Sequence, residues 1–264
     1  MEVVGLTVGI VGLTGLFNNA VNCFEYVQLG RNFGKTFQTS LLKLDNSRLR
    51  LSRWGKSVGI NGDLNNVQSL NQTFTSAQDV EKAEGILGQI LALFAEAEGI
   101  SSKIKCRAKP DDTTLKVYDP RTDLEPMMAT LHEKMRELCI KRQSRTGLRQ
   151  KAQWALYEEK HFRRLIEDVT DLVNDLVDLF PGAQASQRAL CEIEVSELGT
   201  DESIPVLREI AAGQDEYLEA ALAKVVENRK NDSYTVTFSG NNSSGFQVAH
   251  NSGAISNLRW GGST

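Results

Sequence analysis

Side chains able to do catalytic or metal chemistry are few and scattered in this sequence. The chain has 264 residues with three histidines and four cysteines, and no two cysteines stand in a CxxC spacing. Zinc sites and disulfide frameworks need clustered ligands. No P-loop, GxGxxG or GxSxG motif is present, and the acidic pairs Asp111-Asp112 and Glu158-Glu159 stand alone. The sequence therefore predicts no catalytic residue, no metal site and no cofactor, which argues against an enzyme.

The chemistry that the sequence does offer is self-assembly of its C-terminal end. Residues 231–264 hold seven serines, five asparagines and five glycines, no proline, and only Asp232 and Arg259 as charged residues. Apolar residues alternate there, and low charge with Asn and Gln side chains is typical of segments that stack into cross-β fibrils. The same composition also fits a disordered polar tail. The candidate amyloid core consists of Gly245, Phe246, Gln247, Val248, Ala249, Asn251, Gly253 and Ile255.

Side-chain alternation gives this core a physical rationale. In a strand, Phe246 and Val248 would lie on one face and Gln247 and Ala249 on the other. Stacked copies would then join their Gln247 amides into a hydrogen-bonded ladder, while the two apolar side chains form a dry seam. We therefore expect residues 229–264 to act as a prion-forming tail, separate from a helical domain over residues 1–228.

The N-terminal segment carries the second candidate function, which is membrane insertion. Residues 3–24 are uncharged, and a 22-residue helix is about 33 Å long, enough to cross a bilayer core. No basic n-region or cleavage site indicates a signal peptide, and three asparagines weaken a permanent membrane span. Burial as the first helix of a bundle and insertion on activation both remain open. The candidate inserting residues are Val3, Val4, Leu6, Val8, Ile10, Val11, Leu13, Leu16 and Phe17.

Charge is distributed unevenly along the chain. Residues 134–151 contain seven basic residues and one acidic residue, which indicates either a patch for anionic lipid or a solvated helix face. The candidate lipid-binding residues are Lys141, Arg142, Arg145 and Arg149. The net charge of −4 and the pI near 5.6 argue against a nucleic-acid partner.

Apolar spacing between the two ends predicts an all-α domain. Helical periodicity covers residues 37–58, 76–105, 127–146, 184–198 and 204–228, and it is clearest inside 147–180. Proline-rich residues 109–126 interrupt the helices, and residues 115–118 could form one short strand or hairpin. Trp54 and Trp154 are expected in the core.

Several stretches resemble the fungal HeLo, or prion-inhibition and propagation, domain. They are LFNNAVNCFEYVQLGR at 16–31, RLSRWG at 50–55, SRTGLRQKAQWALY at 144–157 and LVDLFP ending at Pro181, in the family's order. The resemblance implies a helical bundle whose N-terminal segment can be expelled into the plasma membrane, which kills the cell.

The tail departs from the two-repeat β-solenoid of that family, since it holds one candidate unit. Residues 245–253 instead resemble RHIM-like fungal amyloid motifs of the pseudo-palindromic type. Such motifs imply self-assembly templated by a NOD-like receptor. Separately, we expect a cytoplasmic resting form and a possible homodimer through the helical domain. The alternative is a non-toxic adaptor that uses the tail as a scaffold.

Overall fold

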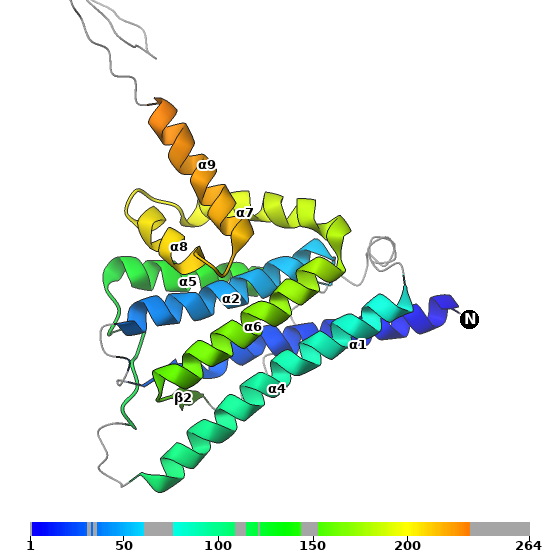
Figure 1. Ribbon diagram of the computed structural model, residues 1–264, viewed down its shortest axis with the longest axis horizontal. Helices are drawn as coiled ribbons and strands as arrows, with labels where there is room; N and C mark the ends of the chain where they lie inside the picture. The colour runs from blue at the N-terminus through cyan, green and yellow to red at the C-terminus, as the bar shows by residue number, and fades with distance from the viewer. Residues whose placement is uncertain are drawn as a thin grey trace, which may run out of the picture. The chain divides into compact units, whose positions relative to one another are not determined.

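A computed structural model describes residues 2–30, 33, 36–60, 76–108, 115–120, 122–143 and 153–232, without the side chains of residues 2–10 and 229–232. The chain divides into two units, residues 1–224 and 225–264. The helices are α1 (Glu2–Cys23), α2 (Phe37–Ser57), α4 (Ala77–Arg107), α5 (Pro126–Lys141), α6 (Glu159–Leu179), α7 (Gln184–Leu198), α8 (Ser203–Ala211) and α9 (Glu216–Asp232), as Figure 1 shows. The 3-10 turns η1 (Phe24–Tyr26) and η5 (Pro181–Ala183) and the strands β1 (Val27–Leu29) and β2 (Trp154–Leu156) complete the elements of the described residues. The predicted all-α fold class is confirmed.

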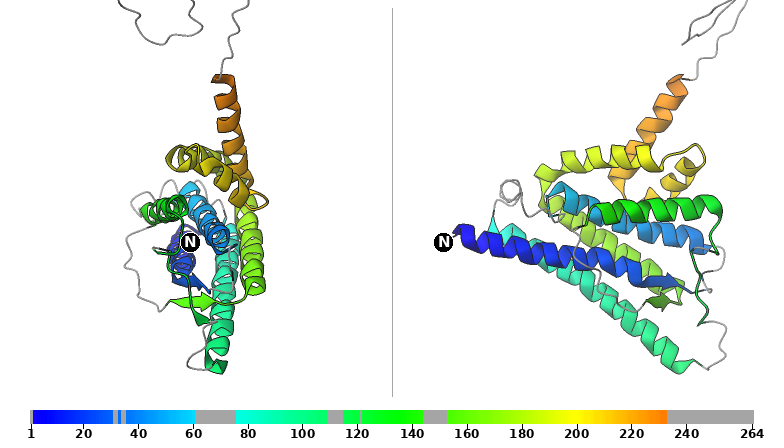
Figure 2. Two further views of the ribbon diagram at one scale, coloured as in Figure 1. Left: turned by 90° about the vertical axis from the view of Figure 1, so that its left-hand side faces the viewer. Right: turned by 180° about the vertical axis from the view of Figure 1, so that it is seen from behind.

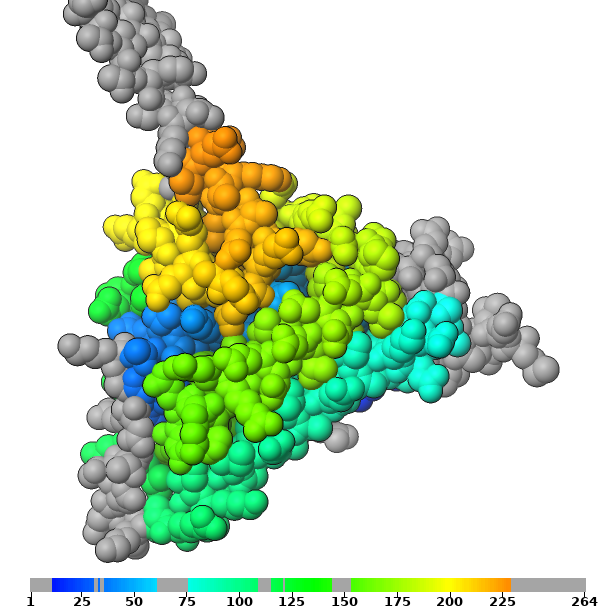
Figure 3. Space-filling view, in the orientation of Figure 1, coloured from blue at the N-terminus to red at the C-terminus, as the bar shows by residue number. Residues whose placement is uncertain are grey.

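Two long amphipathic helices form one layer of the first unit. Helix α4 starts where the sequence places a cap, because the Ser76 hydroxyl accepts a hydrogen bond from the Asp79 amide at 3.1 Å. Its buried face repeats at helical spacing, and so does that of α6. The two helices pack on each other, and Figure 3 shows them lying side by side across one face, with little of α1 visible behind them.

Helix α1 lies along the other side of α4, as both views in Figure 2 show. Helix α2 occupies the centre of the unit and packs against α5, α6, α7 and α8. Trp54 of α2 is fully buried between Phe17 of α1, at 6.1 Å between ring centroids, and Phe180 after α6, at 5.9 Å. Trp154 is buried too, so both tryptophans lie in the core as expected.

Two local expectations need correction, and one segment holds an element that was not predicted. Segment 147–180, where the helical period is clearest, also contains strand β2, which pairs in parallel with β1 near the N-terminus. The predicted helix over 204–228 is two helices, because Gly213 adopts a φ of +69° that breaks the helix. The expected β element at 115–118 is a single antiparallel bridge between Val117 and Gly30. These features depend on long-range pairing and one backbone angle, which helical periodicity does not encode.

Candidate functional site: the packed first helix and its hinge

The described part of α1 has one fully buried face. Leu13, Phe17, Ala20 and Val21 are each 0% exposed and recur at the spacing of one helical face. Val11 on the opposite side is 54% exposed, and Gly15 is also exposed. A Cβ added at Gly15 would touch nothing. The helix is therefore held by one apolar stripe and leaves an open outer face.

A glycine on α2 admits the largest side chain of that stripe. A Cβ added at Gly55 would lie 2.2 Å from the Phe17 ring, which is far inside van der Waals contact. The ring of Phe17 therefore lies directly over the α2 backbone, beside Trp54. No residue larger than glycine fits at position 55 unless α1 or the ring moves.

Polar contacts with Gln143 supplement the apolar face. The Gln143 side chain, just after α5, donates a hydrogen bond of 2.9 Å to the Asn22 amide oxygen and a longer one of 3.5 Å to the Asn18 carbonyl. Asn18 is buried and Asn22 is half-buried. Two of the asparagines that weaken the segment as a membrane span thus help to hold it in the folded domain.

The chain directly after α1 is anchored by backbone hydrogen bonds. β1 pairs with β2 over three residues, the Gly30 amide donates to the Leu156 carbonyl at 2.7 Å, and the Tyr118 amide donates to the Leu29 carbonyl at 2.8 Å. Phe24 packs edge-on against Phe94 of α4 at 4.7 Å. We call residues 23–26, which join α1 to this anchored strand, the hinge.

Glu25 adds a charged clamp at that hinge. Its carboxylate receives hydrogen bonds from Arg48 of α2 and from Arg136 of α5, the latter at 3.0 and 3.1 Å. Burial alone raises the pKa of the Glu25 carboxyl, but the two arginines outweigh burial and hold that pKa below its ordinary value. Glu25 is thus ionised at neutral pH and ties the hinge to two helices.

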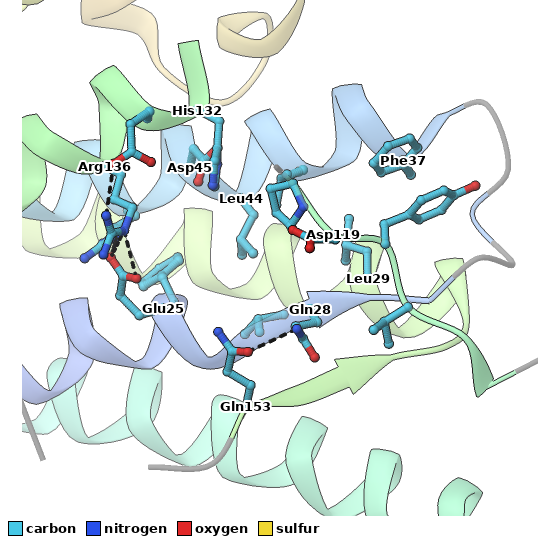
Figure 4. Close-up of a pocket in the computed structure, with 18 of the residues that line it drawn as sticks. Glu25, Gln28, Leu29, Phe37, Leu44, Asp45, Asp119, His132, Arg136 and Gln153 are labelled. Carbon is cyan, nitrogen blue, oxygen red and sulfur yellow. Dashed lines mark hydrogen bonds and ion pairs between the residues drawn. The ribbon is translucent and has the colours of Figure 1, made fainter. Parts of the chain in front are cut away.

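A cleft of about 830 Å³ opens beside this clamp, between β1, α2, α5 and residues 117–120. Figure 4 shows the Glu25–Arg136 pair at one end and Phe37 at the other, with Leu44 between them. Glu25 is paired there with Arg48 and Arg136, and His132 with Asp45 at 2.7 Å. The described lining holds no serine, threonine or cysteine. No cluster of potential metal ligands occurs in the described residues either.

The predicted site residues fall into three groups. Leu13 and Phe17 face the core, Leu16 is half-buried and Val11 faces outward. Val3, Val4, Leu6, Val8 and Ile10 belong to α1, but their side chains lie outside the description. The whole amyloid core, Gly245 to Ile255, and the basic residues Arg145 and Arg149 also lie outside the described residues.

The two remaining basic residues differ in their surroundings. Lys141 is exposed, whereas Arg142 is 6% exposed and bonds to Glu194 at 2.5 Å. Arg142 is therefore not available to a lipid headgroup in this conformation. Sequence reasoning missed Glu25, Gly55 and Gln143 as residues that hold α1. Gly55 and Glu25 do stand in stretches that carry the family resemblance, RLSRWG and FEYVQLGR. That resemblance, however, does not indicate that they hold α1.

Among the helices of the described residues, none combines the length and apolar character needed to cross a bilayer.

Comparisons with known proteins agree with this architecture. Residues 5–208 match the HeLo family, described as prion-inhibition and propagation, and residues 230–257 match the SesB domain on fungal death-pathway proteins. Heterokaryon incompatibility protein s of Podospora anserina is 35% identical over 226 residues, which cover 86% of this chain and 75% of that protein. Protein S of the same species is 35% identical over 222 residues, 84% of this chain and 74% of that protein.

Solved structures of a HeLo relative also resemble this chain. A double mutant of the HET-s N-terminal domain superposes with a TM-score of 0.73 at 36% identity and covers 81% of this chain and 98% of that one. The unmutated domain gives a TM-score of 0.73 at 35% identity. The tail match supports a death-pathway domain at the predicted position, while its assignment to the pseudo-palindromic class stays a prediction. With its fold and most of its length matched, the chain belongs to the HeLo, or prion-inhibition and propagation, family.

Proposed function

We propose that this protein is a conditional executioner of fungal cell death. In its resting form α1 is packed in the helical domain, and templated amyloid assembly of the tail, residues 229–264, releases α1 into the plasma membrane. The observation that carries the proposal is α1 itself, which is uncharged from Val3 to Cys23, packs through an apolar stripe and is followed at once by a firmly anchored hinge. No catalytic step is part of this function.

Family membership supports a role in fungal heterokaryon incompatibility and cell death. Two relatives that cover most of the chain carry heterokaryon incompatibility in their names, and the tail matches a domain of a fungal death-pathway protein. The release of α1, the templating partner and the lipid target are the finer steps that we add. The templating partner would be a NOD-like receptor with a matching motif, or another copy of the tail.

The energetics of α1 suit an element with two stable locations. Burying Leu13, Phe17 and Val21 contributes ~1.5–3 kcal/mol each in the packed state. The eleven strongly apolar residues of segment 3–24 would gain roughly 3–7 kcal/mol in a bilayer. Apolar side chains of the segment are thus favoured in both locations, and a bias from outside the segment can decide between them.

The tail can supply that bias because it overlaps the last helix. α9 runs to Asp232, whereas the SesB match starts at residue 230. Residues 230–232 cannot be helical and part of a cross-β stack at once. Fibril formation would therefore act on the C-terminal end of α9, and it would also crowd many helical domains along one fibril.

The test uses two variants of the full chain in a liposome leakage assay seeded with tail fibrils. Val11→Lys with Gly15→Lys places two charges on the outer face of α1, where the packed state has room. Each lysine costs roughly 2.5–3.5 kcal/mol at a bilayer centre. We expect fibrils to form but leakage to stop. The matched control, Gly85→Lys with Gln89→Lys, puts the same charges on the exposed face of α4 and should leak like the wild type.

A second variant tests the trigger. Gln247→Pro removes a strand amide donor and fixes φ, so seeded fibrils and leakage should both disappear. Leakage by the α1 lysine variant at the wild-type level would exclude α1 as the membrane-active element. Fibrils without leakage from the wild-type chain would favour the adaptor function instead.

A further inference from the structure

Five charged side chains are buried together next to α2 and serve no part of the hinge. Arg53 of α2 is 1% exposed, Glu194 of α7 is 0% exposed and Asp215, just before α9, is 1% exposed. Arg142 and Arg50 complete this group, and their side chains are 7% and 10% exposed. We call these residues the buried charge cluster. Buried ionic groups are weak sources of stability, so their presence calls for another explanation.

Arg53 is the centre of the cluster. Its guanidinium binds Glu194 at 2.6 Å and Asp215 at 2.8 and 2.9 Å, and Arg142 binds the other oxygen of Glu194 at 2.5 Å. Burial alone raises the pKa of the Asp215 carboxyl, but Arg53 outweighs burial and lowers that pKa. Three arginines thus share two carboxylates, and one Arg50 nitrogen is buried without a hydrogen-bond partner among the described residues.

Asp215 connects this cluster to the start of the tail-bearing helix. Its carboxylate accepts a hydrogen bond from the Leu218 amide at 3.2 Å, and its carbonyl accepts one from the Glu219 amide at 2.9 Å. Asp215 therefore caps the N-terminus of α9 while it neutralises Arg53. A displacement of the first turn of α9 would remove one of the two carboxylates and leave three buried arginines with Glu194 alone.

Two members of the cluster are adjacent in sequence to residues that hold α1. Arg53 precedes Trp54 and Gly55, which contact Phe17. Arg142 precedes Gln143, which donates to Asn22. Figures 1 and 2 place α2 between α7 and α8 on one side and α1 and α4 on the other. The cluster therefore touches α9 at one end and reaches α1 by two separate routes.

We propose that the buried charge cluster is the coupling element that transmits a displacement of α9 to α1. This inference rests on the proposed release of α1 and assigns the residues that cause it. While Asp215 is in place, Arg53 and Arg142 keep α2 and Gln143 in the positions that bind α1. When Asp215 leaves, the unbalanced guanidiniums must reorient toward solvent, and the contacts of Phe17 and Asn22 are lost with them.

The test measures hydrogen exchange of the full chain without membrane or fibril seeds. Asp215→Asn keeps the shape and the capping acceptor but removes the charge, so exchange at residues 11–23 should accelerate about tenfold or more, while α4 stays protected. The control is Glu192→Gln, which breaks an exposed ion pair between α7 and α9, Glu192 with Lys224 at 2.8 Å. It should leave α1 unchanged. Unchanged α1 exchange in Asp215→Asn overturns the proposal.

If Asp215→Asn unfolds the whole domain, the coupling is tested in the opposite direction, from α1 to the start of α9. Coupling free energies act equally in both directions, so Phe17→Leu should accelerate exchange at residues 213–224. Val169→Ala, a core truncation in α6, serves as the control and should not do so selectively. No selective effect of Phe17→Leu would reject the coupling. Because membrane leakage is not measured, failure here is distinguishable from failure of the proposed function.

Discussion

Helix α1 and the seven residues after it, residues 24–30, are held by different forces. The described part of α1 relies on apolar contacts and the Gln143 amide. Residues 24–30 rely on β1–β2 backbone hydrogen bonds and on the ionised Glu25 between Arg48 and Arg136. Apolar contacts can be replaced by contacts with lipid, whereas charged and backbone pairs have no equivalent partner in a bilayer. The comparison supports the proposal that α1 is the part that leaves and that the moving part ends before residue 24.

Removing the clamp at the hinge should have the largest effect on stability. Glu25→Gln leaves Arg48, only 4% exposed, without its anionic partner, and loss of one member of a buried pair costs about 3–5 kcal/mol. We expect a large fall in the urea midpoint. The exposed pair between Glu159 and Arg163 provides the control, since Glu159→Gln should change the free energy of unfolding by less than about 1 kcal/mol. Equal midpoints for the two variants would refute the clamp.

A methyl group under α1 should have an intermediate effect. Gly55→Ala would place its Cβ 2.2 Å from the Phe17 ring, and overpacking costs ~1–3 kcal/mol. We expect faster hydrogen exchange in α1 and higher unseeded leakage. Gly88→Ala in α4, where an added Cβ touches nothing, should instead stabilise by about 0.5–1 kcal/mol. Combining Gly55→Ala with Phe17→Leu should recover part of the loss. No recovery would show that the two positions are not in contact.

The smallest effect is expected from pH, through His132 in the cleft wall. Burial alone lowers the pKa of His132, but Asp45, with Glu133 and Glu25, outweighs burial and raises that pKa above its ordinary value of 6.5. A raised folded-state pKa contributes stability below 6.5 that is lost as pH rises through the folded value. The free energy of unfolding should therefore fall from about pH 6 to about pH 8. His132→Gln should flatten this dependence, and an unchanged slope would contradict it.

The elements that sequence could predict are those with local signals. Ser76 marks the start of α4 and Pro181 the end of α6, and the apolar period of α7 gives both of its bounds. The uncharged segment 3–24 was evident as a special segment for the same reason. What holds α1 was not evident, because Gly55, Gln143 and Glu25 come from three separate elements and have ordinary residue types. Their roles depend on which helices pack together, and Arg142, predicted as a lipid contact, is buried for the same reason.

The break between α8 and α9 shows the same limit. The apolar period continues across residues 204–228, yet Gly213 ends the first helix and Asp215 caps the second. Asp215 has this role because Arg53, 162 residues earlier in the chain, neutralises it in the core. A local pattern cannot reveal such a partner.

The most direct measurement of the central claim compares two fluorophore positions on either side of the hinge. In a full chain with Cys23→Ala and Cys106→Ser, one label is placed at Val11→Cys on α1 and another at Gln28→Cys on β1. Liposomes carrying a quencher in the acyl region are then added with tail fibrils as seed. The account predicts that the label at position 11 becomes quenched after seeding, while the label at position 28 does not. Quenching at both positions, or at neither, would contradict the release of α1 about a fixed hinge.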